Sequence, residues 1–522
     1  MGTTVSFARS GDGVVKRPPA WLASLVVVVL VAIGALVYVV AVHDDSLATD
    51  PKPTGEKGAK GLARYYTQDL DWEDCGQGRC ATVEVPIEYE KPDGDTTELR
   101  VAVFEAPGKN DRSLFVNPGG PGGSAIDFAE YVREEFGKSV LKLYDIVGVD
   151  PRGVGLSSPM DCISDKQRDE GAASDPDPDS SAEVEEARAS FTAHGKGCVE
   201  NAGALAAHVS TAEFARDLDV VRALVGSKTF DWFGASYGTL LGGAYATLFP
   251  DRVGRMVLDG AVDPSEDAEE SSFRSVVAFQ RALDAYIEDC VDDKGCPLGD
   301  SVREATDKVA DLLQDLEDKP MKTDSYRKLT KGMGMGAIGG ALYEKAAWPQ
   351  LTYSLEAAFE GDGTGLLLIG DLIAERAPNG AYLSNRGEVA PAIGCLDGDE
   401  RGTVADVKAA MPRFEKASPI FGESAAWGLM GCDGWPIKVT HPFPDLDGAG
   451  ADPIVVIGTT RDPATPVEWA EAMADQLDSG VLVTRDGDGH TAYGSGNDCI
   501  DALVDDFLVK GTVPKDGTTC EE

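Results

Sequence analysis

The stretch DWFGASYGTLLGGAYATLFP, residues 231–250, places a serine between two glycines at the point where an apolar run meets a helical one. The residues before Ser236 are typical of a buried strand, and those after it are typical of a helix ended by Pro250. The segment GASYG, residues 234–238, fits the pattern G-x-S-x-G, which puts a serine on a sharp turn between a strand and a helix. Glycine and serine also share ordinary turns, so the pattern needs support from the rest of the chain.

Strand-like and helix-like runs alternate on both sides of this stretch. The predicted strands lie within residues 82–90, 99–106, 113–119, 144–155, 229–236, 252–264, 452–463 and 480–490. The predicted helices lie within residues 212–226, 237–250, 466–477 and 499–511. This alternation predicts an α/β fold with a mostly parallel, doubly wound sheet. In such sheets ligands bind at the carboxyl ends of the strands.

The alternation stops between residues 265 and 445, where helical runs and scattered aromatic residues predominate. We interpret residues 265–445 as a helical cap inserted into an α/β domain made of residues 65–264 and 446–522. An acidic run at residues 175–190 is expected to be a solvated surface segment.

The N-terminal region predicts a membrane anchor. Residues 21–43 contain no charged side chain, and a bilayer core needs roughly 20 apolar residues in a helix. Lys16 and Arg17 predict that residues 1–20 are cytoplasmic, with residues 44–64 as a linker outside. A buried core helix is the alternative, and cleavage after Ala48 would release a secreted protein.

Charge and cysteine content restrict the class of protein further. The net charge of −42 disfavours any nucleic-acid partner. Ten cysteines in an exported chain indicate disulfides rather than a metal site, since no zinc-ligand spacing is present. The expected pairs are Cys75 with Cys80, Cys290 with Cys296, Cys162 with Cys198, Cys395 with Cys432, and Cys499 with Cys520.

A serine becomes a nucleophile only when a base takes its proton, and histidine is the usual base near neutral pH. Of the five histidines, only His490 follows a late strand. Asp462 ends the strand before it, which gives the chain order Ser236, Asp462, His490 of the α/β-hydrolase fold. The competing acids are Asp259, Asp263, Asp486 and Asp488.

Two further features fit this chemistry. The loop FVNPGGPGGSA, residues 115–125, offers Gly119 and Gly120 as oxyanion-binding positions, together with the backbone N–H of Tyr237. Thr465 follows Asp462 by three residues and either supports it by hydrogen bonding or serves as a turn or cap residue.

Several motifs together carry a family resemblance: NPGGPGGSA, VGVDPRGVGLSSP, GASYGTLLGGAYATLFPDRVGRMVLDGAVDP, TTRDPATP and GDGHTAYG. They are similar to those of the exported tripeptidyl aminopeptidase branch of the α/β hydrolases, which is related to prolyl aminopeptidases. The resemblance runs from about residue 65 to residue 520. It implies a triad of Ser236, Asp462 and His490, and release of short peptides or amino acids from free N-termini. Where prolyl aminopeptidases carry His-Gly-Gly-Pro-Gly, this chain begins the motif with Pro118, which puts strict proline specificity in doubt.

An aminopeptidase must also bind the ammonium group of its substrate. Glu388 and Asp397, in a cap segment next to Cys395, are the candidate carboxylates, with ordinary surface charge as the alternative. No metal or organic cofactor is expected. The alternative functions are a carboxylesterase or lipid acyl hydrolase on the same fold, and a binding protein without catalysis.

Overall fold

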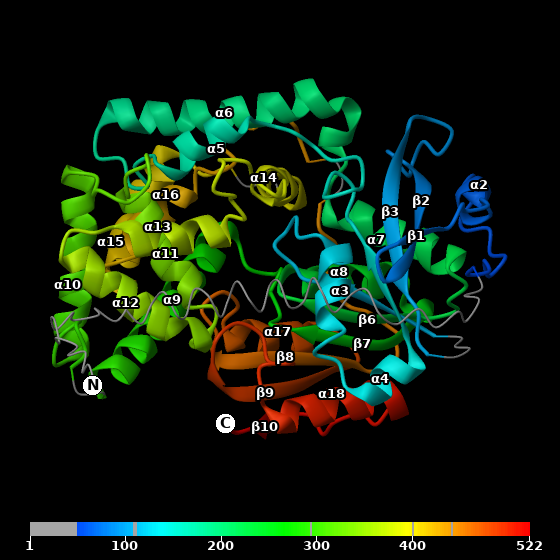
Figure 1. Cartoon of the computed structure of the whole chain (residues 1–522). Helices are drawn as coiled ribbons and strands as arrows, with labels where there is room; N and C mark the ends of the chain where they lie inside the picture. The colour runs from blue at the N-terminus through cyan, green and yellow to red at the C-terminus, as the bar shows by residue number, and fades with distance from the viewer. Residues whose placement is uncertain (1–49, 108–111, 293–294, 399–400, 440–441) are drawn as a thin grey trace, which may run out of the picture. The chain divides into compact units, whose positions relative to one another are not determined.

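A computed structural model describes residues 50–107, 112–292, 295–398, 401–439 and 442–522. Ten strands form one sheet in the order β1-β2-β3-β5-β4-β6-β7-β8-β9-β10 (Figure 1). The strands are β1 Glu73–Cys75, β2 Gly78–Pro86, β3 Thr96–Phe104, β4 Ser113–Asn117, β5 Asp145–Val149, β6 Phe230–Ala235, β7 Val253–Asp259, β8 Ile454–Arg461, β9 Gly480–Asp488 and β10 Thr518–Cys520.

The sheet is mostly parallel, as predicted. In this order, neighbouring strands from β5 to β10 run parallel, whereas the pairs β1–β2, β2–β3 and β3–β5 are antiparallel. Every strand predicted from the sequence is present. The strands β1 and β10 were not predicted, because three residues are too few to show an apolar alternation.

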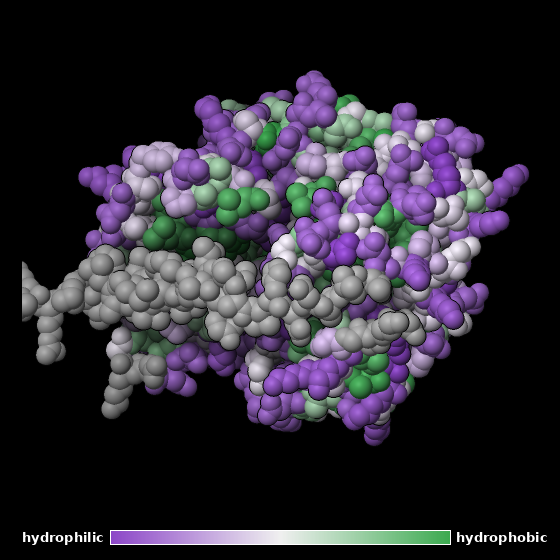
Figure 2. Space-filling model, turned by 45° about the vertical axis from the view of Figure 1, so that its right-hand side comes forward, coloured by the Kyte–Doolittle hydropathy of each residue, from purple (hydrophilic) through white to green (hydrophobic). Residues whose placement is uncertain are grey.

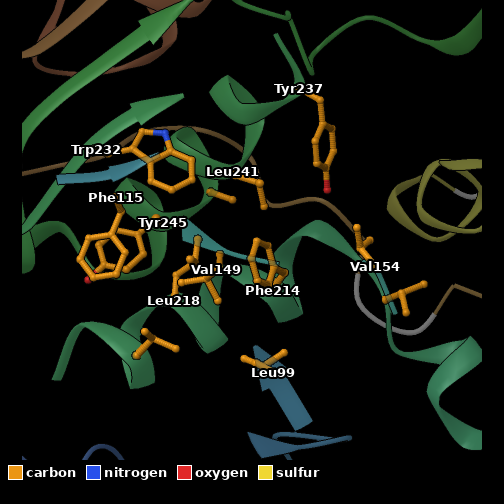
Figure 3. Packing of buried hydrophobic residues seen from close by; sticks show 14 of the residues in the cluster. Leu99, Phe115, Val149, Val154, Phe214, Leu218, Trp232, Tyr237, Leu241 and Tyr245 are labelled. Carbon is orange, nitrogen blue, oxygen red and sulfur yellow. The ribbon is translucent and has the colours of Figure 1, made fainter. Parts of the chain in front are cut away.

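Helices cover both faces of the sheet. These helices are α2 Ala63–Tyr66, α3 Ala125–Val132, α4 Lys138–Leu143, α7 Thr211–Leu224, α8 Tyr237–Leu248, α17 Val467–Gln476 and α18 Asp498–Lys510, with short 3-10 helices η1 Gly203–Ala207 and η2 Pro250–Arg252. Adjacent residues of β6 face opposite sides: Trp232 packs into the core under α7 and α8 (Figure 3), whereas Phe233 packs into the core under α3 and α18. The chain is therefore doubly wound.

The segment between β7 and β8 is helical, as the cap prediction requires. It contains α9 Ala268–Asp292, α10 Val302–Asp318, α11 Lys331–Ala341, η3 Lys345–Ala347, α12 Trp348–Phe359, α13 Thr364–Ile373, α14 Arg386–Asp397, α15 Val404–Ala417 and α16 Gly422–Gly428. Most of these helices pack into two cores of their own, separate from those of the sheet.

The acidic run at residues 175–190 is not a simple surface segment. Its second half begins α6, Ser181–Ala202, which follows α5, Asp165–Ala172. Most of α6 is solvent-accessible, because only Gly195 and Cys198 are buried, but the helix lies above α14 (Figure 1). A second insertion, between β5 and α7, therefore joins the cap.

Five disulfides are present, and they are the five pairs expected from the sequence. The predicted anchor at residues 21–43 lies outside the described residues. Within the described ranges, no helix is long and apolar enough to cross a bilayer. Hydrophilic residues cover most of the face seen in Figure 2, in keeping with the high net charge.

Candidate active site

Ser236 stands on a sharp turn between β6 and α8. Its backbone has φ 56° and ψ −125°, a conformation that a residue with a side chain rarely adopts. A Cβ on Gly234 would lie 2.3 Å from the carbonyl oxygen of Gly238, and one on Gly238 would lie 2.8 Å from that of Asn117. Both glycines are therefore required by close backbone approach, as the G-x-S-x-G pattern predicted.

His490 and Asp462 lie together at the carboxyl ends of β9 and β8. The His490 Nδ1 is 2.9 Å from each carboxylate oxygen of Asp462. Asp462 also accepts hydrogen bonds from the backbone N–H groups of Ala464, Thr465 and Thr491. With Nδ1 held by Asp462, the Nε2 of His490 is the nitrogen left to exchange a proton with a substrate.

The charges of this pair support a base and its orienting acid. Burial opposes ionisation of Asp462, but His490 and the surrounding donors outweigh it and lower the pKa of that carboxyl. Burial likewise opposes protonation of His490, but the Asp462 carboxylate outweighs it and raises the pKa of the imidazole above its usual value. His490 is thus a stronger base than a free histidine.

Thr465 hydrogen-bonds to Asp462, which was one of the two roles predicted for it. Its hydroxyl donates to Asp462 Oδ2 at 2.9 Å and lies 3.3 Å from His490 Nδ1.

The competing acids have other partners. Asp486 and Asp488 bind Arg461, and Asp263 binds Ser265 and Gln476. Asp259 accepts the N–H groups of Ala492 and Tyr493 and so anchors the loop that carries His490.

The nucleophile and the histidine belong to one cluster. The Ser236 N–H donates to the Asp259 carbonyl at 2.8 Å, and a Cβ on the next residue, Gly260, would lie 3.4 Å from His490 Cε1. Among the described residues no hydrogen bond joins the Ser236 hydroxyl to His490. Such bonds often tighten only when substrate binds.

The glycine loop after β4 lies directly against the nucleophile. A Cβ on Gly119 would lie 2.8 Å from the backbone nitrogen of Tyr237 and 2.9 Å from the Cβ of Ser236. The Gly119 N–H donates to the Asn117 side chain at 2.9 Å, whereas the described residues give the Gly120 N–H no acceptor. Gly120 and Tyr237 are therefore the oxyanion donors that this geometry supports, and Gly119 supplies the close approach.

The DPRGVG motif, residues 150–155, is a scaffold for that glycine loop. Asp150 accepts the hydroxyl of Ser124 at the start of α3, and on its other oxygen the N–H of Leu156. Arg152 is fully buried and makes two bonds of 2.7 Å to Asp217 of α7. The sequence shows this motif as part of the family resemblance, but its structural role depends on contacts with residues distant in the chain.

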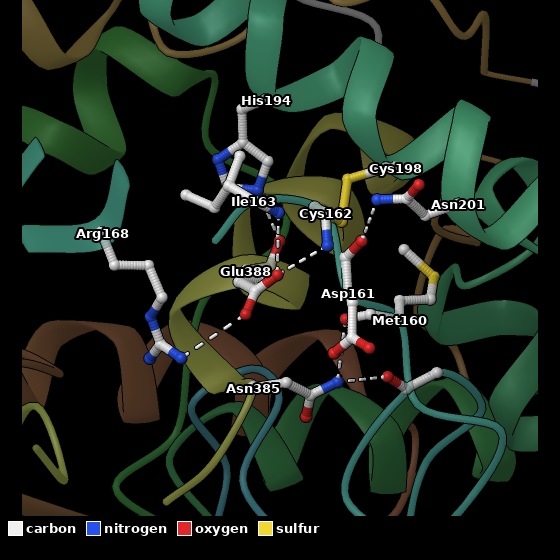
Figure 4. Close-up of a disulfide and its surroundings, with 11 residues drawn as sticks. Met160, Asp161, Cys162, Ile163, Arg168, His194, Cys198, Asn201, Asn385 and Glu388 are labelled. Carbon is white, nitrogen blue, oxygen red and sulfur yellow. Dashed lines mark hydrogen bonds and ion pairs between the residues drawn. A yellow bond between two sulfur atoms is a disulfide. The ribbon is translucent and has the colours of Figure 1, made fainter. Parts of the chain in front are cut away.

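Glu388 does not present a carboxylate to a substrate (Figure 4). Its Oε2 accepts the N–H groups of Cys162 and Ile163, and its Oε1 is 3.4 Å from Arg168. The side chain is buried, so the expected ammonium-binding role is not supported, and Glu388 instead fixes α14 to the Cys162–Cys198 disulfide region. His194 lies near this disulfide, but both sulfurs are bonded to each other and offer no thiolate ligand.

Asp397 also has internal partners. Its carboxylate accepts the N–H and the hydroxyl of Thr211, and the Thr211 oxygen contacts the Tyr237 hydroxyl at 2.5 Å. Burial raises the pKa of Asp397 to about 7, with the bonds from Thr211 opposing that shift. Asp397 is therefore connected through Thr211 to Tyr237, the residue after the nucleophile, and is not placed to bind a substrate ammonium group.

The helix α14 consequently touches both sides of the oxyanion site. At its start, Arg386 packs on the glycine loop, where a Cβ on Gly122 would lie 3.3 Å from the Arg386 Cα. At its end, Asp397 connects to Tyr237. Nothing in the sequence marked Arg386 or Thr211, because their roles arise only from this packing.

Two cavities are lined by residues of the cap, and the smaller of them includes a catalytic residue. The larger, of about 970 Å³, lies between α5, α6, α14 and α16 and includes Arg386. The smaller, of about 350 Å³, is lined by His490, by Ala235 next to the nucleophile, and by Tyr343 of the cap. Tyr343 accepts the His490 backbone N–H at 2.8 Å and packs its ring edge-on to the imidazole at 5.0 Å. The cap thus contacts the catalytic histidine itself.

Comparison with known proteins places this site in a family. A family model described as TAP-like protein matches residues 418–520. Serine protease Hip1 of Mycobacterium tuberculosis is 35% identical over 482 residues, which cover 87% of this chain and 91% of that relative. The chain belongs to the TAP-like branch of the α/β hydrolases. Tripeptidyl aminopeptidase of Streptomyces lividans is 31% identical over 485 residues, or 88% of each chain. Carboxylesterase B of Mycobacterium tuberculosis is 35% identical over 460 residues, or 86% of this chain and 88% of the relative.

This TAP-like chain is therefore a serine hydrolase. A solved esterase from Thermogutta terrifontis also matches, at 14% identity and a TM-score of 0.34, covering 82% of this chain and 98% of that chain. A likeness this distant says nothing about activity.

Proposed function

We propose that this chain is an exported serine aminopeptidase, of tripeptidyl or prolyl type, that cleaves peptides near a free N-terminus. Ser236 attacks the scissile carbonyl while His490 takes its proton, and the N–H groups of Gly120 and Tyr237 stabilise the oxyanion. His490 then protonates the departing amine, and water releases the acyl-enzyme by the reverse proton transfers.

The observation that carries this proposal is the large cavity beyond the glycine loop. The cavity has a volume of about 970 Å³, lies between cap helices, and is lined by Arg386, whose backbone packs against the glycine loop at Gly122. A pocket bounded by the cap accommodates a short N-terminal segment, whereas an endopeptidase needs a groove open at both ends. The names of the Streptomyces and Mycobacterium relatives support a peptide substrate.

Because Glu388 and Asp397 have internal partners, we assign the substrate ammonium group to other carboxylates. Asp175 and Glu186 line the large cavity and are exposed. No cation among the described residues forms an ion pair with either side chain. The two carboxylates lie on the α5–α6 insertion, so this insertion would set the length of the released peptide.

Export is proposed from two features of the chain. The five disulfides are typical of an oxidising compartment, and residues 21–43 predict a single membrane span with the catalytic domain outside. Cleavage near Ala48 would give a secreted form instead.

A peptide library with free and acetylated N-termini, read by mass spectrometry, tests the function. We expect short N-terminal fragments from free peptides alone, and a loss of at least about 10⁴-fold in kcat/KM in Ser236→Ala with unchanged thermal unfolding. Equal cleavage of acetylated peptides at internal bonds would contradict the proposal. Retained turnover in Ser236→Ala would contradict the nucleophile assignment.

The second candidate is a carboxylesterase, and the 35% identity to carboxylesterase B favours it specifically. The triad serves esters and amides alike. Hydrolysis of acyl esters without cleavage of any free-amine peptide would establish this candidate over the first.

A further inference from the structure

The smaller cavity is lined by His490, the residue that protonates the leaving group. In serine hydrolysis the histidine protonates the leaving group, so the leaving group departs on the histidine's side of the nucleophile. The Nδ1 of His490 is bound to Asp462, and His490 lines the cavity of about 350 Å³ together with Ala235, the residue before the nucleophile. The larger cavity is separate and is lined by Arg386 of α14, which packs against the glycine loop at Gly122.

The cavity is built where the cap meets the α/β domain. Its lining comes from the turn before η3, from α3 and from the loop after His490, and it includes Phe128, Tyr131, Tyr343 and Tyr493. Tyr131 is 62% exposed and Tyr343 is 38% exposed, so these two rings stand at the opening rather than in a core.

Two carboxylates at this cavity make no direct ion pair with a basic side chain of the described residues. Within the described ranges, neither Glu135 nor Glu344 forms a salt bridge, although both line the cavity. Burial raises the pKa of Tyr131, and the charges of Glu135 and Glu344 raise it further, so both carboxylates act on the same ring. Burial raises the pKa of Glu344, whereas the charges of His490 and Arg485 oppose that shift.

The basic side chains of the cavity are already neutralised. Lys345 binds Asp488 at 2.8 Å, and Arg485 binds Glu522 at 3.1 Å. The remaining charge in the cavity is therefore negative and lies beside aromatic rings. This combination suits a cation, which gains from the carboxylates and from the ring faces together.

We propose that this cavity binds the first residue of the departing peptide and prefers a lysine or arginine side chain there, with Glu344 and Glu135 as the specificity-determining residues. This inference rests on the proposed peptidase function. The cap turn at Glu344 would then select the first residue of the departing peptide. The released N-terminal segment would be selected by a different pocket.

Matched peptides test the assignment. The substrates share one N-terminal segment that the enzyme releases and differ only in the next residue: lysine, methionine or glutamate. We expect kcat/KM for lysine to exceed that for glutamate by about tenfold at low ionic strength, and the ratio to fall with added salt. Glu344→Gln should reduce the ratio, and Glu135→Gln/Glu344→Gln should bring it close to one.

Glu356→Gln is the matched control, because Glu356 is an exposed carboxylate on the cap helix α12 and does not line either cavity. It should leave the lysine-to-glutamate ratio unchanged. A ratio that stays the same in the double variant while peptides are still cleaved would overturn the proposal.

Failure of the proposed function gives a different result. If only esters are hydrolysed, the same variants are compared on esters of one acid with cationic and neutral leaving alcohols. Loss of cationic preference in the double variant would then still support the cavity assignment, and an unchanged preference would overturn it.

Discussion

The Asp462 carboxylate controls the basicity of His490 through direct contact. The pKa of His490 is raised because the nearby carboxylate favours the imidazolium, and only the neutral imidazole can take the serine proton. Activity should therefore fall as the pH drops through the pKa of His490, which lies above that of a free histidine.

The substitution Asp462→Asn tests this relation. We expect kcat to fall about 10⁴-fold, because the amide stabilises neither the reactive tautomer nor the imidazolium. The residual activity should have its acid limb at lower pH than the wild type, since the charge that raised the pKa is gone. A pH profile of kcat/KM measures both effects. Asp475→Asn, an exposed change on α17, serves as the control, and an acid limb that does not move would contradict the assignment.

At the scale of elements, α14 is the cap helix that contacts the oxyanion site. Asn385 donates its amide to the carbonyls of Gly153 and Met160, so the start of α14 is tied to the loop after β5. The Cys395–Cys432 disulfide holds its end. A helix anchored at both ends can keep Gly120 and Tyr237 in a fixed relation during the reaction.

Loss of the Asp397 contact should therefore affect the rate more than substrate binding. In Asp397→Asn the amide nitrogen cannot accept the Thr211 hydroxyl, so the hydroxyl that contacts Tyr237 is no longer held in place. We expect kcat to fall about tenfold with a smaller change in KM, since small displacements of catalytic groups are costly. Tyr237→Phe should have a similar effect.

The double variant Asp397→Asn/Tyr237→Phe provides the control for this prediction. If the two residues act through one chain of hydrogen bonds, its kcat should be close to that of either single variant. Fully additive losses, or a change confined to KM, would show that Asp397 does not position Tyr237.

On the scale of the whole molecule, the net charge of −42 is the dominant electrostatic feature. Self-repulsion destabilises the compact state, and salt screens it with a Debye length of about 8 Å at 0.15 M. We expect the Tm to rise by a few degrees, roughly 2–5 °C, between about 10 mM and 150 mM NaCl. Scanning calorimetry in NaCl and KCl at matched ionic strength measures this. A Tm that is unchanged or falls, or that depends on which of the two salts is present, would contradict simple screening.

Much of this architecture could be read from local patterns. Apolar runs bounded by turn residues predicted the strands from β2 to β9, because a strand buried on both faces needs apolar side chains on both. The G-x-S-x-G turn and the strand ends were enough to select Ser236, Asp462 and His490, because parallel strands bring their carboxyl ends to one edge. Short spacing favoured the pairs Cys75–Cys80 and Cys290–Cys296, whereas sequence could not establish the other three pairs, which the structure joins.

Only the tertiary structure assigned the acidic side chains and the cap contacts. Glu388 and Asp397 were plausible ligands for an ammonium group until Cys162, Arg168 and Thr211 were found as their partners. Tyr343 was one of the scattered aromatic residues of the cap, and nothing in the sequence connected it with His490, which it contacts. The sequence does not distinguish a carboxylate or an aromatic ring that contacts a substrate from one that contacts another part of the chain. Long-range packing alone decides which of the two it meets.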